Sequence, residues 1–271
     1  MQVLAIVNQK GGVGKTTTCV NLAAAFAAAG RKVLVVDLDP QGNSSTGLGV
    51  TKDKRGLGIY QVLSGSVPFQ QAVSKTRIKN LDVTSSTVDL AAAELELVSA
   101  LNREFKLKTT VVDKLQGYDF VFIDCPPSLG LLTINALTAA SRIIIPMQCE
   151  FYSLEGLSQL LKTVQLVKAN LNPGLEVFGV LLTMFDSRNN LSNQVAREVK
   201  KYLGKKLFVT TIPRNVRVSE APSHGLPVIA YDYNCRGSRA YIRLAKEILE
   251  KIALEQGVKK DTKFAKASKV A

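Results

Sequence analysis

A short segment near the N-terminus combines glycine, lysine and threonine in an order suited to binding phosphate. Its sequence is QKGGVGKTT (residues 9–17), and it lies between the apolar run Val3–Asn8 and an alanine-rich stretch that ends at Gly30. In a strand, loop and helix of this kind, glycines let consecutive backbone N–H groups turn toward an anion, and the helix start adds partial positive charge. We therefore predict a loop that holds nucleotide phosphates. Its members are Gly11, Gly12, Val13 and Gly14.

The residues after the glycines add the side chains that such a site requires. Lys15 would bridge the β- and γ-phosphates of a nucleotide, and the Thr16 hydroxyl would ligate magnesium. Thr17 would complete the loop at the first turn of the helix. A glycine-rich turn without a ligand is the alternative, but the strand, loop and helix context argues against it.

Two later apolar runs end in aspartate. The run Lys32–Asp37 leads into a polar segment marked by glycine and proline that also contains Asp39, and the run Phe120–Asp124 ends at Asp124. Folds of this kind bind ligands at the carboxyl ends of their strands. Asp124 has the context of an aspartate that holds Mg²⁺ directly or through water. Together with the loop, these acidic strand ends predict a site for a magnesium-nucleotide complex.

The elements that would position these residues alternate between short apolar runs and longer helical segments. The apolar runs are continuous, so both faces of the sheet should be covered by helices. We expect one doubly wound α/β domain over residues 1–256 with a mostly parallel sheet. The expected strands are Val3–Asn8, Lys32–Asp37, Phe120–Asp124, Arg142–Pro146, Val177–Thr183 and Leu207–Ile212. The expected helices are Thr17–Ala29, Leu90–Arg103, Leu131–Ala140, Leu154–Ala169, Leu191–Leu203 and Ser238–Glu255.

Positive charge is concentrated in the last third of the chain. From Arg188 to the C-terminus there are 18 lysines and arginines against 7 acidic residues, whereas the first 187 residues carry 17 against 15. This asymmetry favours a face that binds a polyanion, although a solubilising surface would have the same composition. Residues 257–271 hold five lysines and few large apolar residues. We expect them to form a basic, disordered tail.

The remaining composition argues against several classes of protein. The four cysteines are far apart and form no CxxC pair, so neither a zinc site nor a disulfide framework is indicated. His224 is the only histidine, which rules out a histidine cluster. No apolar run approaches the roughly 20 residues that span a bilayer, and the N-terminal segment has no signal-peptide pattern. We therefore expect a cytoplasmic protein without a membrane partner.

The phosphate loop departs from the general pattern GxxxxGK[ST], because Gln9 stands where that pattern has its first glycine and Lys10 follows it. The form KGGxGK[ST] resembles the deviant Walker A class of P-loop NTPases. That class includes the ParA/Soj partition ATPases, the division-site regulator MinD, the nitrogenase iron protein and arsenite-pump ATPases. The strings DLDPQGNSSTGLG (residues 37–49), IDCPPSLG (123–130) and IPRNVRVSEAPSHG (212–225) resemble ParA/Soj proteins of the short chromosomal type. The resemblance covers residues 1–255.

This resemblance implies a role for each matching residue. Lys10 would reach across a dimer interface to the nucleotide of the partner, although read alone it would be an ordinary solvated lysine. Asp39 would position or activate the attacking water, and Asp37 and Asp124 would support magnesium. Pro213 lies where the family contacts adenine.

The family also implies an activity and partners. It implies Mg²⁺-dependent ATP hydrolysis that is weak without a partner, an ATP-dependent homodimer, and binding to double-stranded DNA without sequence preference. Arg188 and Arg217 match positions implicated in that DNA binding. A ParB-like centromere-binding protein would stimulate hydrolysis during partition of a chromosome or plasmid on the nucleoid. A MinD-like spatial regulator and a metabolic P-loop enzyme remain as alternatives.

Overall fold

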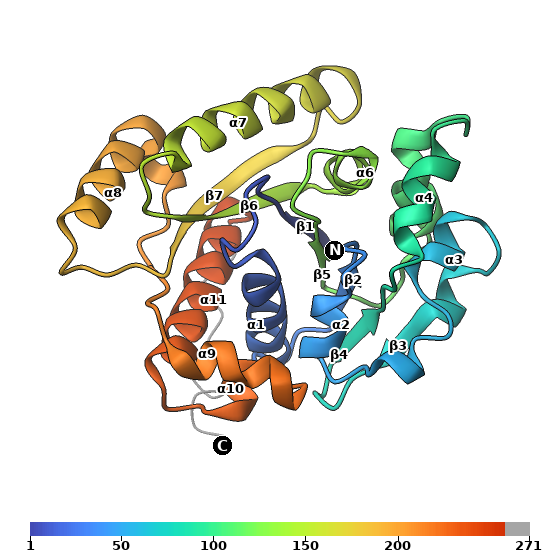
Figure 1. Ribbon diagram of the computed structural model, residues 1–271, viewed down its shortest axis with the longest axis horizontal. Coiled ribbons are helices and arrows are strands. Elements are labelled where there is room, and N and C mark those ends of the chain that lie inside the picture. Colours follow the sequence, from blue (N-terminus) through green and yellow to red (C-terminus); the bar gives the residue numbers. More distant parts are fainter. Residues whose placement is uncertain (258–271) are drawn as a thin grey trace.

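Within residues 1–257, the part of the chain that the computed structural model describes, a seven-stranded sheet forms the centre of the fold (Figure 1). The strand order is β3-β4-β2-β5-β1-β6-β7, and neighbouring strands are parallel except that β3 is antiparallel to β4. Apart from Gly257, the expected basic tail lies outside the described residues. The strands are β1 (Gln2–Ile6), β2 (Val33–Asp37), β3 (Val73–Lys75), β4 (Leu81–Thr84), β5 (Phe120–Asp124), β6 (Arg142–Gln148) and β7 (Glu176–Thr183).

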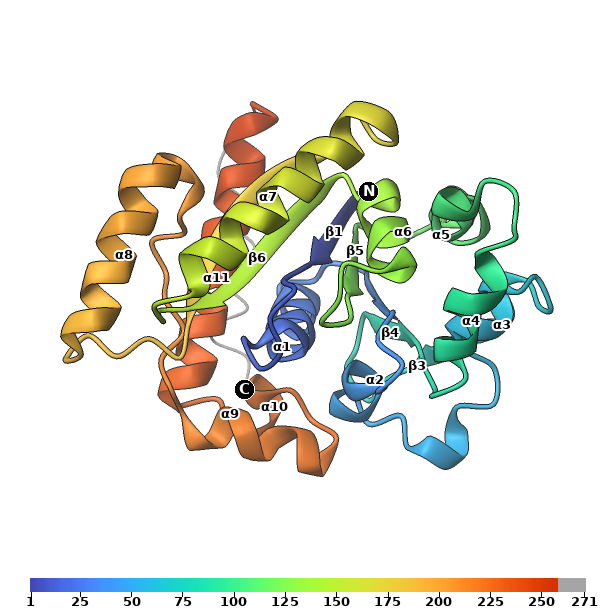
Figure 2. The ribbon, with the colours of Figure 1, turned by 45° about the horizontal axis from the view of Figure 1, so that its top comes forward.

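Helices cover both faces of this sheet. The helices are α1 (Lys15–Ala28), α2 (Asn43–Gly47), α3 (Ile59–Leu63), α4 (Leu90–Leu97), α5 (Lys106–Thr110), α6 (Leu131–Ala139), α7 (Ser153–Asn170), α8 (Asn190–Leu203), α9 (Val216–Glu220), α10 (Val228–Tyr231) and α11 (Arg236–Glu255). Helices α1 and α11 pack side by side on one face, and α6, α7 and α8 cover the other, as Figure 1 and Figure 2 both show.

The continuous apolar runs are explained by these two layers. Along β1, Val3 and Ala5 point into the core beneath α6 and α7, while Leu4 and Ile6 point into the core beneath α1 and α11. Successive strand residues face opposite sides of a sheet, so a strand covered on both sides must be apolar at every position.

Two expected elements differ from the structure, and two strands of the structure were not expected. Strands β3 and β4 were not predicted, and the helix expected over Leu90–Arg103 ends at Leu97. The segment Leu207–Ile212 runs beside β7 but forms only one isolated bridge, between Leu207 and Val180, so its prediction as a strand is wrong. Its backbone N–H groups at Val209 and Thr210 instead donate to the carboxylate of Glu247 on α11, at 2.7 and 2.9 Å. The hydrogen-bond ladder of a strand is interrupted there.

The register of the sheet brings the two acidic strand ends together. Asp124 of β5 pairs with Asp37 of β2 on one side and with Ile6 of β1 on the other. Because β1 leads directly into the glycine loop, the loop and both carboxylates lie at the carboxyl edge of the sheet, where ligands bind in folds of this kind.

Candidate nucleotide site

The glycine loop is held in an open shape by bonds from neighbouring strands. Gly12 and Gly14 adopt φ angles of 73° and 86°, a left-handed conformation that favours glycine. The Thr183 hydroxyl at the end of β7 donates to the Val13 carbonyl at 2.8 Å, and the Gln148 amide of β6 donates to the Gly12 carbonyl at 2.9 Å. The loop carbonyls are thus turned toward β6 and β7.

The N-terminus of α1 is free to bind an anion. Its N-cap is Gly14, and no side chain accepts a hydrogen bond from the first N–H groups of the helix. Lys15, the first residue of the helix, is buried, and its Nζ donates to the Lys10 carbonyl at 3.0 Å. Burial lowers the pKa of Lys15, while the charges of Asp124 and Asp39 partly counteract this effect. A buried ammonium beside unpaired N–H groups is a site for phosphate.

Asp124 has a carboxylate oxygen that fits a cation. The side chain is fully buried, its Oδ2 accepts a 2.7 Å hydrogen bond from Ser44, and its Oδ1 has no hydrogen-bond partner. Burial raises the pKa of Asp124, the nearby charge of Asp37 raises it further, and the Thr16 hydroxyl lowers it. A buried, unpaired carboxylate oxygen is costly. Magnesium prefers one or two carboxylates completed by hydroxyl, water and phosphate oxygens, so Thr16 and Asp124 fit this ion.

Asp37 is held differently, because both of its oxygens accept hydrogen bonds from the segment that follows it. Ser45 donates to Oδ2 through its backbone N–H at 2.8 Å and its hydroxyl at 2.6 Å, and the Asp39 N–H lies 3.3 Å from Oδ1. Burial raises the pKa of Asp37, and the bonds from Ser45 act against that rise. Asp37 therefore anchors the segment that carries Asp39, and its role at a metal stays a prediction.

Asp39 lies on this segment, buried and near Lys15. It is 7% exposed, and its Oδ1 accepts a 3.0 Å hydrogen bond from the Gln41 N–H. Its charge is close enough to raise the pKa of Lys15. This position allows the Asp39 carboxylate to contact a group bound between the loop and α2.

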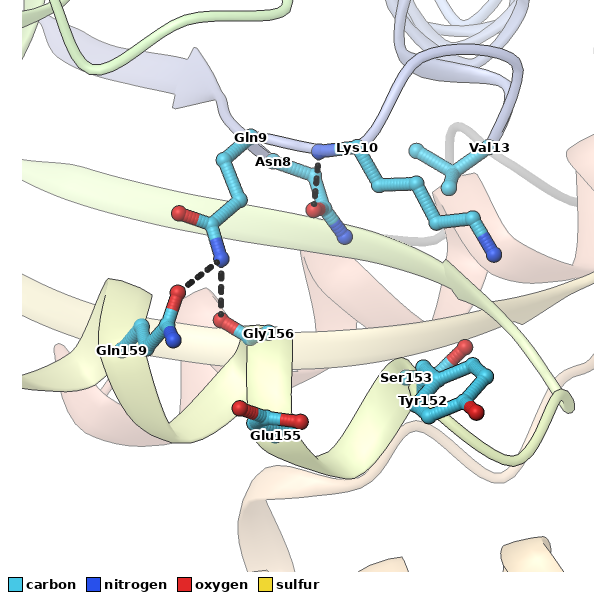
Figure 3. A pocket seen from close by; sticks show the side chains of 9 residues that line it. All are labelled: Asn8, Gln9, Lys10, Val13, Tyr152, Ser153, Glu155, Gly156 and Gln159. Atoms are coloured by element: carbon cyan, nitrogen blue, oxygen red, sulfur yellow. Dashed lines mark hydrogen bonds between the residues drawn. The ribbon is translucent and has the colours of Figure 1, made fainter.

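The Lys10 ammonium pairs with Glu150, two residues beyond the end of β6. Both side chains are about half exposed, at 43% and 51%. Lys10 also lines a pocket of about 320 Å³ between the loop and the first turns of α7. Figure 3 shows this pocket, in which the Gln9 amide donates to the Gly156 carbonyl and to Gln159 at 3.2 and 2.9 Å. An exposed ion pair of this kind can exchange partners at little cost.

The remaining predicted residues lie on other loops. Pro213 forms an isolated bridge with Phe185 just after β7, at the same edge of the sheet as the glycine loop. Arg188 is exposed before α8, and its guanidinium bonds both oxygens of Asp186 at 3.0 and 2.9 Å. Arg217 on α9 is half exposed and bonds Glu220 at 2.9 Å. The two arginines form no contact with each other.

Comparisons with known proteins identify the family. Residues 1–177 match the family described as AAA domain. Over 247 residues the chain is 55% identical to the sporulation initiation inhibitor protein Soj of Bacillus subtilis, with 91% of this chain and 98% of that protein covered. It is 51% identical over 253 residues to the chromosome partitioning protein ParA of Caulobacter vibrioides, covering 93% and 95%. The chain belongs to the Soj/ParA family of chromosome-partitioning ATPases.

Solved structures confirm the predicted doubly wound P-loop fold of this Soj/ParA member. A Mycobacterium smegmatis protein described as cobyrinic acid a,c-diamide synthase, with bound ADP and magnesium, superposes with a TM-score of 0.82 at 36% identity and covers 96% of this chain and 97% of that one. The cell division ATPase MinD of Pyrococcus furiosus has a TM-score of 0.78 at 27% identity, covering 93% and 99%. Among residues 1–257 of the Soj/ParA chain, no helix has the length and apolar character to cross a bilayer.

Several residues that support the site were missed by sequence reasoning. Ser44 and Ser45 lie inside the string DLDPQGNSSTGLG, yet their bonds to the buried aspartates were not foreseen. Arg55 donates to Thr46 at 2.7 Å and so fixes α2 from outside that string. Glu150 lies two residues beyond the end of β6, and a carboxylate so close to a strand end was the available signal.

Proposed function

We propose that this Soj/ParA member is a DNA-partition ATPase that binds ATP with Mg²⁺, dimerises in the ATP state and then binds double-stranded DNA without sequence preference. The observation that carries the proposal is the meeting of three groups: the uncapped start of α1, the buried Lys15, whose ammonium bonds only a backbone carbonyl of the loop, and the unpaired Oδ1 of Asp124. A phosphate with a bound divalent cation would satisfy all three. Similar structures hold ADP or an ATP analogue with magnesium.

Each side chain then has a defined task. The backbone of residues 11–17 and the Lys15 ammonium hold the β- and γ-phosphates, while Thr16 and Asp124 hold the cation. Bound magnesium would neutralise the charge that develops on the phosphate oxygens. Asp39 has one oxygen occupied by the Gln41 N–H, which leaves the other to orient the attacking water. Without a partner, we expect this turnover to be weak.

Lys10 supplies the link between nucleotide and assembly. In one chain it is paired with the half-exposed Glu150, and such pairs are worth about 0–1 kcal/mol. Transfer of Lys10 to the phosphates of a second protomer would replace this pair with a stronger, charge-assisted contact. ATP therefore favours the dimer.

The DNA-binding face is assigned to the basic last third of the chain, with Arg188 and Arg217 as contacts. Both arginines are surface residues, and their partner carboxylates are only partly buried, so phosphate can compete for them. A dimer presents twice as many cations as one chain, which makes assembly a switch for DNA binding on the nucleoid. A ParB-like partner would stimulate hydrolysis and so release the DNA.

The purified protein tests this proposal directly. Affinity for two unrelated duplexes is measured with ATP and with ADP, and ATP turnover is measured with and without a ParB homologue. We expect tight binding to both duplexes with ATP alone and faster turnover with the homologue. Equal affinity in both nucleotide states would contradict the switch. The 36% identity to the M. smegmatis synthase keeps a metabolic reaction as the second candidate, and turnover that requires a small carboxylic acid would favour it.

A further inference from the structure

An apolar groove lies between the start of α7 and the exposed face of α8, two helices that neighbour each other in Figure 1. Its volume is about 330 Å³, within the range of pockets that take specific ligands. Phe151 and Tyr152 form one wall, and Leu191 and Val195 of α8 form the other. The groove is distinct from the phosphate loop, and its α8 wall belongs to the basic last third of the chain.

The aromatic wall of this groove is unusually exposed. Phe151 and Tyr152 are 74% and 73% exposed, and their rings pack edge to face with centroids 5.2 Å apart. Of the phenylalanines in residues 1–257, Phe151 alone is exposed. A contiguous patch of exposed apolar side chains marks an interaction site, and aromatic residues often supply the energetic centre of one.

The charge of the groove opposes that of the protein. Glu155 and Glu198 are the charged residues that line it, and neither forms an ion pair with any described residue. The chain as a whole carries a formal charge of +13. The two glutamates would repel DNA phosphates. A segment with lysine or arginine beside apolar side chains would complement both the glutamates and the apolar lining of the groove.

The groove is also adjacent to the nucleotide site. Phe151 follows Glu150, the residue that pairs with Lys10. Tyr152 and Glu155 line both the groove and the pocket beside Lys10, as Figure 3 shows for the latter. A molecule that packs on Phe151 would therefore contact the segment that contains Glu150, the partner of Lys10.

We infer that this groove docks the protein that stimulates ATP turnover, through a basic segment of that partner that carries apolar anchors. The inference rests on the proposed function and adds to it the docking site and the chemistry of the docked segment. The apolar anchors pack between Phe151 and Leu191, and the lysines or arginines face Glu155 and Glu198. The binding mode is that of an amphipathic segment in a hydrophobic groove.

The experiment titrates a purified ParB homologue from the same organism against the full-length chain and measures ATP turnover. The test variants are Phe151→Ala and Glu198→Lys, and both change exposed side chains. The matched controls are Leu166→Ala, an exposed apolar residue farther along α7, and Glu176→Lys, an exposed acid at the start of β7. ATP-dependent dimerisation and DNA affinity are measured for all four.

We expect each test variant to raise the homologue concentration for half-maximal stimulation by at least about tenfold, the effect of losing an interface anchor. Basal turnover and dimerisation should stay at wild-type values in both test variants, DNA affinity should stay at the wild-type value in Phe151→Ala, and both controls should respond normally. Stimulation of the test variants at wild-type concentrations would overturn the docking site alone. Loss of dimerisation in them would overturn it in favour of a self-interface. A homologue that fails to stimulate the wild-type chain would overturn the proposed function and this inference with it.

Discussion

The nucleotide edge and the outer surface of this protein hold their charged groups in opposite ways. Asp37 and Asp124 are fully buried and fixed by hydroxyl and backbone N–H donors from α2. Arg188 and Arg217 lie at the surface, where Arg188 pairs with Asp186 and Arg217 pairs with Glu220 and, at 3.5 Å, with Asp232. Buried charges must be satisfied in one geometry, whereas exposed pairs contribute little and exchange readily.

Lys10 combines both environments, because its backbone is fixed at the nucleotide edge and its side chain lies at the surface. It therefore connects the nucleotide site to the surface. Its backbone belongs to the braced loop, since its N–H donates to Asn8 at 3.0 Å. Its side chain belongs to the surface, where it pairs with Glu150. Substitutions should therefore have large effects on nucleotide chemistry at the buried edge, intermediate effects at Lys10 and small effects at the arginines.

Lys15→Ala should have the largest effect. It removes the only side-chain ammonium that the structure buries among residues 1–257, so nucleotide phosphates would lose their charge-assisted contact. Such contacts contribute about 1.5–3 kcal/mol, which predicts a loss of ATP affinity of roughly tenfold to 150-fold. Isothermal titration calorimetry measures it, with the exposed Lys114→Ala as control. Near-normal affinity in Lys15→Ala would contradict the phosphate site.

Asp39→Ala should preserve ATP binding and dimerisation but slow hydrolysis by about 10²–10⁴-fold, the usual contribution of a positioned general base. The phosphate loop and the bonds of Asp37 to Ser45 remain intact, because Asp39 offers only a backbone N–H to Asp37. Light scattering with ATP should therefore detect a trapped dimer. A monomer under these conditions would show that Asp39 has a structural role.

Lys10→Ala and Glu150→Gln should act in opposite directions. The first should retain ATP binding by the monomer and lose ATP-dependent dimerisation, because the proposed contact lies across the interface. The second releases Lys10 from an exposed pair worth at most about 1 kcal/mol, so dimerisation should strengthen by no more than about fivefold. Analytical ultracentrifugation across protein concentrations measures both. Wild-type dimerisation of Lys10→Ala would return this residue to the role of a solvated lysine.

Local patterns allowed most of the buried edge to be predicted. The loop, Lys15 and the three aspartates follow or end apolar runs, and the carboxyl ends of parallel strands meet at one edge. Strand β4 was missed because Asp82 and Thr84 break its apolar pattern. Both are buried nevertheless, and Asp82 is satisfied by bonds of 2.7 Å from Lys75 and Tyr118.

Contacts between distant segments could not be predicted. Glu150 meets Lys10 across 140 positions, and no local pattern pairs them. The segment Leu207–Ile212 has the composition of a strand, and the competing acceptor, Glu247, lies on a helix formed later in the chain. Both the Lys10–Glu150 pair and the loss of strand structure at Leu207–Ile212 depend on tertiary packing.

Arg188→Ala and Arg217→Ala should have the smallest effects, because each removes one exposed cation from a surface that carries many. Each should reduce the slope of the logarithmic affinity for DNA against salt by about 0.9, the value for one neutralised phosphate. Turnover without DNA should not change. Asp186→Asn is the matched variant, since it releases Arg188 from its carboxylate and keeps the cation, so its slope should not fall. Affinity for unrelated duplexes across a salt series, with ATP, measures all three. An unchanged slope in both alanine variants would show that other residues of the basic third contact the DNA. An unchanged slope in one variant alone would show that its arginine does not contact the DNA.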